Sequence, residues 1–247
     1  MTASGETQPA SARRVMVIGA HAADFAWRAG GAMAVCTARG GEARVMALSY
    51  GERGESGELW KEEGQTVENV KRLRRAEAER AAAALGAPFE CLDLGDYPLE
   101  VDAAALATIC DRIREFAPQV LITHTDSDPF NPDHPAAHHA VARARALAAG
   151  AGVPSAFATI SPPSLYLFEP HQPELCNFTP NTFLDITEVM ERKLQAMAEM
   201  KAQSYLQSYY AERAGHRANH ARRSSGEASI RHAEAFQRVT PQVVREL

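Results

Sequence analysis

The sequence predicts an α/β fold with a Rossmann-like, mostly parallel sheet and helices on both of its faces. Short apolar runs alternate with longer segments of helical composition from residue 13 to about residue 148. Each apolar run is short enough for a buried strand, and polar or glycine-containing loops separate the runs from the helical segments. Since 247 residues can bury one sizeable core, we expect a single domain over residues 13–247.

The expected parallel strands are four apolar runs. The first, "RRVMVIGAH", ends in Gly-Ala-His, and the second, "EARVMALSY", repeats the strand pattern. With "PFECLDLGD" and "PQVLITH", the predicted strands cover residues 13–21, 42–50, 88–96 and 118–124. Ligands bind outside the carboxyl ends of such strands, so the loops that follow them are where we expect a site.

The segments between these strands have helical composition. The first closes with "RGG", which is typical of a helix C-terminus, and the others cover residues 66–86, residues 102–116 and an alanine-rich stretch after Pro135. Within the second helix, "KRLRRAEAER" mixes charges of both signs at helical spacing. This pattern predicts an exposed helix face.

The later part of the chain is less regular. We expect further apolar strand-like segments at 164–171 and 182–187 and a helix from about 188 to 203. The last 45 residues are not assigned and are expected to form a C-terminal extension from about residue 203. Residues 1–12 are polar and lack the apolar core of a signal peptide, so we expect a disordered leader and a cytoplasmic protein.

Composition narrows the class of partner. A net charge of -5 gives no support for a nucleic-acid or anionic-membrane partner, and the apolar runs are far shorter than the roughly 20 residues of a membrane span. A small-molecule substrate is therefore expected. The cysteines lack C-x-x-C spacing, which favours reduced thiols over disulfides or a thiolate zinc site: Cys36, Cys91, Cys110 and Cys176. Any metal would be held by nitrogen and oxygen atoms.

His21 and Asp24 leave the end of the first predicted strand together. Their side chains can point into one crevice, where an imidazole and a carboxylate suit a metal ion. A histidine bonded to loop backbone beside an aspartate that caps a helix would give the same pattern. The pair alone leaves both interpretations open.

A group of histidines follows the fourth predicted strand: His124, His134, His138 and His139. Pro135 suits the first position of a helix, which places His134 on a short, rigid loop at the helix entrance. His138 and His139 are expected on a solvated helix surface. His134 is therefore the preferred ligand.

Together, His21, Asp24 and His134 would form a zinc site with three protein ligands and an open position, which is the catalytic pattern. Asp133 and Asn131 lie beside His134 in the sequence. We expect them to be the hydrogen-bond partners that fix the ligand ring.

Two of these segments resemble the motifs of the zinc-dependent LmbE-like, or PIG-L, de-N-acetylase superfamily: "AHAADFAWRAGG" and, far downstream, "NPDH". The resemblance implies this superfamily's fold and assigns its zinc ligands to His21, Asp24 and His134. The family's general-base aspartate is replaced here by Ala23. A positioned base contributes typically about 10²- to 10⁴-fold, so its loss argues against ordinary amide hydrolysis.

Three other positions of these motifs also differ from the superfamily pattern. Its proline is Ala22, its glutamate is Phe25, and the first histidine of its second motif is Asn131.

Further strings are similar to the hydratase branch of this superfamily, the 4-oxalomesaconate hydratases: "SYGERGES", "GDYP", "DPFNPDHP", "FEPHQPE" and "TFLDIT". This resemblance implies hydration of the C=C bond of 4-oxalomesaconate, a keto tricarboxylate, to 4-carboxy-4-hydroxy-2-oxoadipate in gallate and protocatechuate degradation. It also implies zinc and a homo-oligomer, with a hexamer as the expected assembly.

Hydration needs a base for the water and an acid for the carbanionic carbon. Glu55 and Glu52 lie in the loop after the second strand, and we prefer Glu55 as the base, with Glu52 in reserve. His171 lies between two prolines and titrates in a useful range, so we assign it as the acid. The reverse assignment of Glu55 and His171 stays open.

The substrate's carboxylates need cationic or polar partners. Arg53 is the preferred arginine because it lies in the candidate loop and its planar fork can pair with a carboxylate. The other expected substrate-binding residues are His124, Asn131 and Arg217. Two alternatives remain: a zinc deacetylase in which Glu55 replaces the lost aspartate, and a metal-binding protein without catalysis.

Overall fold

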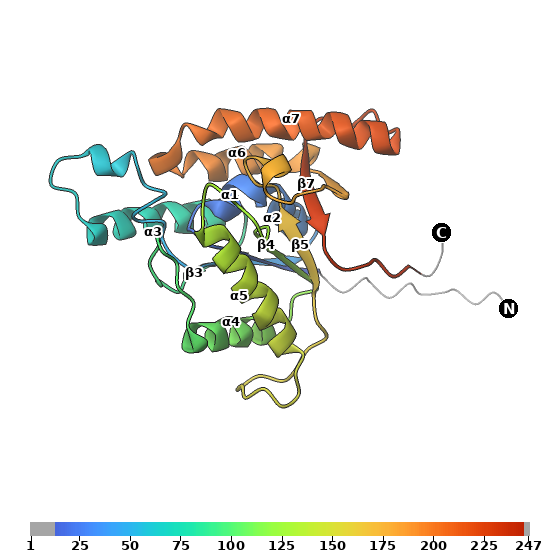
Figure 1. Cartoon of the computed structure of the whole chain (residues 1–247). Coiled ribbons are helices and arrows are strands. Elements are labelled where there is room, and N and C mark those ends of the chain that lie inside the picture. The colour runs from blue at the N-terminus through green and yellow to red at the C-terminus, as the bar shows by residue number, and fades with distance from the viewer. Residues whose placement is uncertain (1–12, 245–247) are drawn as a thin grey trace.

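Seven strands form one sheet in the computed structural model, which describes residues 13–244 (Figure 1). The strands are β1 (Arg14–Gly19), β2 (Glu42–Ala47), β3 (Phe89–Cys91), β4 (Val120–Thr123), β5 (Ser164–Phe168), β6 (Thr182–Asp185) and β7 (Ala233–Arg238). Their spatial order is β3-β2-β1-β4-β5-β7-β6. Residues 1–12, where a disordered leader is predicted, lie outside the described residues.

The sheet is mostly parallel, which confirms the predicted fold class. β3, β2, β1, β4 and β5 run parallel, whereas β7 is antiparallel to both β5 and β6. The strand predicted at 88–96 ends early, at Cys91. Asp93 and Gly95 have φ angles of 54° and 81°, which lie in the left-handed region and interrupt an extended chain.

Helices cover both faces of the sheet (Figure 1). They are α1 (Asp24–Arg28), α2 (Gly30–Ala38), α3 (Val67–Ala84), α4 (Ala103–Phe116), α5 (Asp133–Ala148), α6 (Met190–Ala198) and α7 (Leu206–Ser225). Short 3₁₀ turns occupy Leu59–Lys61, Pro173–Leu175, Thr187–Val189 and Lys201–Gln203. Helices α4 and α5 lie on one side of the sheet, and α6 and α7 lie on the other (Figure 1).

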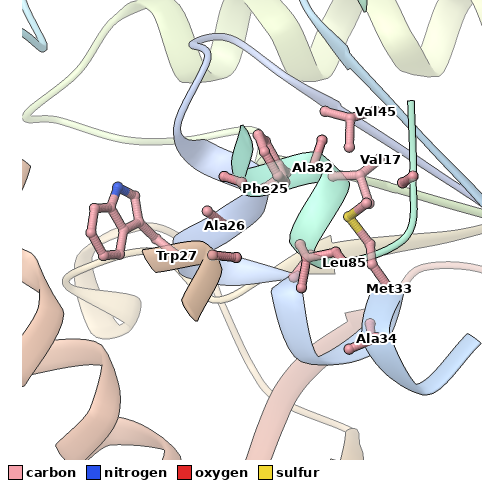
Figure 2. Packing of buried hydrophobic residues seen from close by; sticks show 14 of the residues in the cluster. Val17, Phe25, Ala26, Trp27, Met33, Ala34, Val45, Ala82 and Leu85 are labelled. Carbon is pink, nitrogen blue, oxygen red and sulfur yellow. The ribbon is translucent and has the colours of Figure 1, made fainter. Parts of the chain in front are cut away.

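The two faces of β1 build two separate cores because successive strand side chains point to opposite faces. Val15 and Val17 belong to a cluster with buried residues of α1, α2, α3 and α6. Met16 and Ile18 belong to a second cluster, with buried residues of α4 and α5. Figure 2 shows part of the first cluster, with Val17 of β1 among labelled side chains from α1, α2 and α3. This packing fixes the strand ends that carry the site.

The helix predicted to follow β1 is two helices, α1 and α2, in the structure. At the start of α2, the backbone N–H groups of Gly31 and Ala32 donate to the carboxylate of Glu234 in β7, at 2.7 and 2.8 Å. The Lys193 ammonium of α6 donates to the same carboxylate, at 2.6 Å. A Cβ atom on Gly31 would lie 2.8 Å from the Glu234 carboxyl carbon, so this position requires glycine.

The charged face predicted for the segment "KRLRRAEAER" is only partly exposed. Arg74 is fully buried and Glu77 is 5% exposed, so the prediction is wrong for these residues. The Arg74 guanidinium donates to Glu77 at 3.0 Å and to the carbonyl oxygen of Tyr50 at 3.3 Å. Charge alternation at helical spacing does not distinguish a solvated pair from a buried, fully bonded one.

The segment after residue 203 supplies the long helix α7 and the strand β7. Because β7 lies between β5 and β6, the predicted extension is an integral part of the sheet. The helix predicted from about 188 to 203 consists of α6 flanked by two 3₁₀ turns. Within residues 13–244, no helix combines the length and the apolar composition needed to cross a membrane.

Candidate active site

The predicted site residues lie at the point where the strand order reverses. β2 and β3 lie on one side of β1, and β4 and β5 lie on the other. In open α/β sheets the crevice at such a point is the usual ligand site. The segments that follow β1, β2, β4 and β5 carry the main candidates: His21, Glu55, His134 and His171. His134 lies in the first turn of α5, which begins at Asp133, so its predicted place on a loop before the helix is wrong.

The structure brings together the three predicted metal ligands, His21, Asp24 and His134. One ligand atom from each lies within 4.8 Å of the others, and all three side chains are buried. The Asp24 carboxylate lies 3.6 Å from Nδ1 of His21 and 3.9 Å from Nε2 of His134. Among the described residues, neither of these nitrogens has a hydrogen-bond partner. Two unpartnered buried nitrogens beside a carboxylate fit a metal ion.

The opposite nitrogen of each imidazole is held by a carboxylate. Nε2 of His21 lies 3.2 Å from Asp133, and Nδ1 of His134 lies 2.7 Å from Asp128. Such partners fix the tautomer and the orientation of a metal-binding ring. The expectation that Asp133 and Asn131 hold the ring of His134 is therefore corrected: Asp133 holds His21, and Asp128 holds His134.

The protonation states of two ligands suit a cation. Burial opposes the ionisation of Asp24, but nearby histidines, His124 above all, hold its pKa well below its usual range. Burial and the neighbouring His124 and Arg28 hold the pKa of His134 well below its usual range. An ionised carboxylate and a neutral imidazole are the forms that bind metals.

His124, predicted to bind substrate, lies behind Asp24. Its Nε2 atom is 3.1 Å from the Asp24 carboxylate and 2.9 Å from the backbone nitrogen of Ala20, and its ring stacks on His134 with centroids 4.1 Å apart. Burial lowers the pKa of His124 to about 4. This position suits support of the metal ligands, and substrate binding by His124 stays a prediction.

A second group of possible ligands contains His21, Asp96 and Asp133. The carboxylates of this group are already occupied by backbone N–H donors. Asp96 accepts from Arg53 and Gly54, and Asp133 accepts from Tyr97 and Leu99. These bonds tie the loops after β2 and β3 to the site, so we assign the two aspartates a structural role.

Ala23 and Phe25 supply no polar group beside the metal ligands. Both side chains belong to the first core cluster and are at most 2% exposed. The position at which the superfamily motif has its base is therefore filled by packed hydrocarbon. Any proton transfer needs a different group.

Glu55 is held between two amides. Its Oε1 atom accepts a hydrogen bond from Nδ2 of Asn131 at 2.6 Å, and its Oε2 atom accepts one from Nε2 of Gln203 at 2.7 Å. A Cβ atom on Gly51 would lie 2.9 Å from Cβ of Glu55 and 3.2 Å from Cβ of His21. The glycine therefore allows the Glu55 loop to approach the metal cluster closely.

His171 is linked to the cluster through Arg28. The Arg28 guanidinium lies 3.7 Å from Asp24, and its Nη2 atom is 3.3 Å from Nδ1 of His171. Because an arginine only donates, Nδ1 of His171 is the acceptor and Nε2 carries the hydrogen, 3.3 Å from the Tyr210 hydroxyl. Burial and the charges of Arg28 and Arg213 lower the pKa of His171 to about 3, so the ring is neutral near pH 7.

Glu52 and Arg53 lie in the same loop as Glu55 but have different surroundings. Glu52 is fully buried, and burial raises its pKa. The Arg53 guanidinium is half-exposed and donates to the carbonyl oxygen of Asp96 at 2.8 Å. Glu55 is therefore the loop carboxylate joined to Asn131 and Gln203, while Arg53 keeps an exposed part that a substrate carboxylate can reach.

Arg217 pairs with Glu169 through both arms of its guanidinium, and Nε lies 2.9 Å from Oε2 of Glu169. A substrate carboxylate would have to compete with Glu169 for this arginine. Substrate binding by Arg217 stays a prediction. Asn131 faces Glu55, so its proposed contact with substrate would be made beside that carboxylate.

Sequence reasoning missed three residues of the site: Asp128, Gln203 and Tyr210. Asp128 lies six residues before His134, in the loop that leads into α5, so its proximity was a usable signal. Gln203 lies at the end of the helix predicted from about 188 to 203, and Tyr210 lies in the unassigned segment after it. No local signal predicts their contacts.

Comparison with known proteins shows which family the chain belongs to. The family model described as PIG-L, GlcNAc-PI de-N-acetylase, matches residues 16–145 of the 247. The chain belongs to the PIG-L family. The match covers His21, Asp24 and His134 and ends before His171.

Two curated relatives of this chain have names that give different activities. A 4-oxalmesaconate hydratase of Pseudomonas putida is 42% identical over 238 residues, which is 95% of this chain and 92% of that protein. A 1D-myo-inositol 2-acetamido-2-deoxy-alpha-D-glucopyranoside deacetylase of Rhodococcus erythropolis is 30% identical over 182 residues, which is 64% of this chain and 61% of that protein. The similarity to the hydratase extends through the C-terminal half.

Solved structures give the same contrast. The crystal structure of a 4-carboxy-2-hydroxymuconate hydratase from Pseudomonas putida matches with a TM-score of 0.93 and 42% identity, covering 95% of this chain and 99% of that one. The N,N'-diacetylchitobiose deacetylase of Pyrococcus horikoshii matches with a TM-score of 0.72 and 19% identity, covering 93% and 84%. The second match shows a shared fold.

Proposed function

We propose that this PIG-L protein is a zinc-dependent hydro-lyase that adds water across the C=C bond of 4-oxalomesaconate, giving 4-carboxy-4-hydroxy-2-oxoadipate in the degradation of gallate and protocatechuate. The observation that carries the proposal is the buried Ala23, which supplies no base at the position where the superfamily motif has its aspartate. The nearly full-length similarity to a hydratase supports it.

His21, Asp24 and His134 would hold the metal, and zinc suits a set of two nitrogen ligands and one carboxylate. When bound, zinc supplies a Lewis acid that stabilises negative charge on a substrate oxygen. The rest of the reaction consists of two proton movements, and side chains of this chain can perform them.

We assign Glu55 as the proton acceptor. Two amide donors hold its carboxylate, which leaves further lone pairs free to bind a water molecule. In the reaction the water oxygen bonds to one alkene carbon while Glu55 takes a water proton. The other alkene carbon then receives a proton from an acid.

We assign His171 as that acid. Its Nε2 atom carries the hydrogen, and the charges that lower its pKa belong to Arg28 and Arg213. A bound tricarboxylate would offset these charges, which favours the protonated imidazole when substrate is present. The reverse assignment remains the alternative for the two residues. Arg53, Asn131, His124 and Arg217 stay the proposed substrate-binding set.

The proposal includes a homo-oligomer, with a hexamer as the expected assembly, and a cytoplasmic location. Light scattering coupled to size-exclusion chromatography measures the assembly directly. A monomer at micromolar concentration would contradict it.

The direct test is an ultraviolet assay of 4-oxalomesaconate with the purified, zinc-loaded chain. We expect a change in absorbance that chelation stops and zinc restores. His171→Ala should lose the activity and keep its zinc. Release of acetate from an N-acetyl substrate without turnover of 4-oxalomesaconate would support the deacetylase instead. Absence of both reactions would support a metal-binding protein without catalysis.

A further inference from the structure

Gln203 is a buried side chain that lies far from Glu55 in the sequence and contacts it directly. It belongs to the 3₁₀ turn Lys201–Gln203, between α6 and α7, and is 3% exposed. Its Nε2 atom is 2.7 Å from Oε2 of Glu55. We propose that Gln203 is a positioning residue for the Glu55 carboxylate, an inference that rests on the proposed function.

The orientation of the Gln203 amide is fixed from its other side. Its Oε1 atom accepts a hydrogen bond from Nη2 of Arg74 at 3.0 Å. An arginine has donors and no acceptor, so the amide oxygen must face Arg74. The amide nitrogen therefore faces Glu55, and a flipped amide would set two donors against each other.

Arg74 is itself held in place. It is fully buried, donates to Glu77 at 3.0 Å and to the backbone oxygen of Tyr50 at 3.3 Å. Glu77 in turn accepts from the backbone nitrogen of Ala202, the residue before Gln203, at 3.1 Å. The contacts of Glu77, Arg74 and Gln203 form a ring that closes through the backbone of Ala202. The Gln203 amide therefore has little freedom to turn away from Glu55.

Asn131 holds the other oxygen of Glu55 by the same logic. Its Oδ1 atom accepts from the backbone nitrogen of Asp133 at 3.1 Å, which directs its Nδ2 atom to Oε1 of Glu55 at 2.6 Å. Glu55 thus receives one amide donor at each oxygen. A carboxylate can accept both donors. The two amides therefore hold the Glu55 carboxylate in one rotamer.

The test replaces Gln203 by methionine, which has a similar length and no donor. We expect kcat for 4-oxalomesaconate to fall about 10- to 100-fold, because hydrogen bonds to charged groups contribute this range, with KM within about twofold. The acid limb of the pH profile of kcat/KM should move to higher pH, since the carboxylate loses a donor. Gln203→Glu should move the limb further, because it places a second carboxylate against Glu55.

Gln207→Met is the matched control. Gln207 lies in the first turn of α7, is partly exposed and has no side-chain hydrogen bond among the described residues. Its substitution should leave kcat and the pH profile unchanged. Zinc content and the thermal midpoint of each variant are measured alongside. If Gln203→Met does not fold, Gln203→Glu carries the test, since it keeps an acceptor for Arg74.

A crystal structure of the Gln203 variant separates this inference from the proposed function. We expect Glu55 to occupy more than one rotamer, or to turn from its present position, whatever substrate the protein uses. A folded variant with wild-type kcat, an unchanged acid limb and an unmoved Glu55 would overturn the inference. If the wild-type chain does not hydrate 4-oxalomesaconate, the proposed function fails, and the position of Glu55 in the variant still decides the inference.

Discussion

The proposed metal ligands take their supports from one part of the chain, whereas the proposed proton-transfer residues take theirs from two. The partners of the metal ligands, Asp128, Asp133 and His124, all lie within residues 16–145, the part that matches the PIG-L family model. Gln203 supports Glu55, and Tyr210 contacts His171, from outside that part. The proposed metal site is thus supported within the family-matched part, whereas the proposed acid and base also contact the C-terminal segment.

The substitution expected to disrupt the proposed metal site most completely is His134→Ala. We expect the variant to lose bound zinc and to lose roughly 10³-fold or more in activity, because a Lewis acid contributes several kcal/mol of charge stabilisation. Elemental analysis and the ultraviolet assay measure the two losses. His139→Ala on the exposed side of the same helix is the control and should retain both. Full activity without bound metal would contradict the metal assignment.

Glu55→Ala tests the proposed proton acceptor. Activity should fall by about 10²- to 10⁴-fold while zinc content stays at the wild-type level, since the metal ligands are untouched. Glu58→Ala is the matched control, because Glu58 is exposed in the same loop and pairs with Lys61. Near-normal activity of the Glu55 variant would remove it from the mechanism.

A milder change tests whether the proposed metal ligands and the proposed proton-transfer residues act independently. Asp128→Asn keeps the size of the side chain that holds His134 but removes its charge. We expect zinc affinity to fall about 10- to 100-fold, and activity at saturating zinc to recover largely. Competition with a chromophoric chelator measures the affinity. Asp126→Asn, on an exposed neighbour, should change neither quantity. An activity loss that excess zinc does not restore would show that the proton-transfer residues depend on the arrangement of the metal ligands.

The smallest effect is a pH dependence of stability. The pKa of His171 is about 3 in the folded protein and about 6.5 in an unfolded chain. The unfolded state therefore binds the proton first, so the stability gained from a neutral His171 is present above pH 6.5 and is lost as the pH falls toward 3. Urea unfolding at several pH values should show a shallower acid loss for His171→Asn, by less than about 1.4 kcal/mol per pH unit. Equal slopes for both proteins would contradict the lowered pKa.

Much of the fold and the metal cluster follows from local signals. The alternation of apolar runs and helices predicts the parallel strands, and the strand-order reversal places His21 beside His134. Spacing within one loop, or between two strand ends at one edge of a parallel sheet, is enough to bring these residues together. The resemblance to the superfamily motif also predicted the missing base, because Ala23 stands at the position of the motif's aspartate.

The remaining contacts depend on long-range packing. Arg74 is part of a charge pattern typical of solvated helices, and its burial becomes evident only when Gln203 and Glu77 surround it. The strand β7 follows a segment without periodicity and enters the sheet between two earlier strands. The residues next to Arg74 and β7 in the sequence do not indicate which distant residues these two features contact.

The carboxylate of Glu234 joins the last strand to the first turn of α2, and this has a consequence for synthesis of the chain. While residues after about 230 are still inside the ribosome, the N–H groups of Gly31 and Ala32 and the ammonium of Lys193 have no Glu234 to bind, and β5 has no β7 beside it. The nascent protein therefore carries an open sheet edge until β7, Ala233–Arg238, emerges. Products that stop short of β7 should be poor at folding and prone to aggregate.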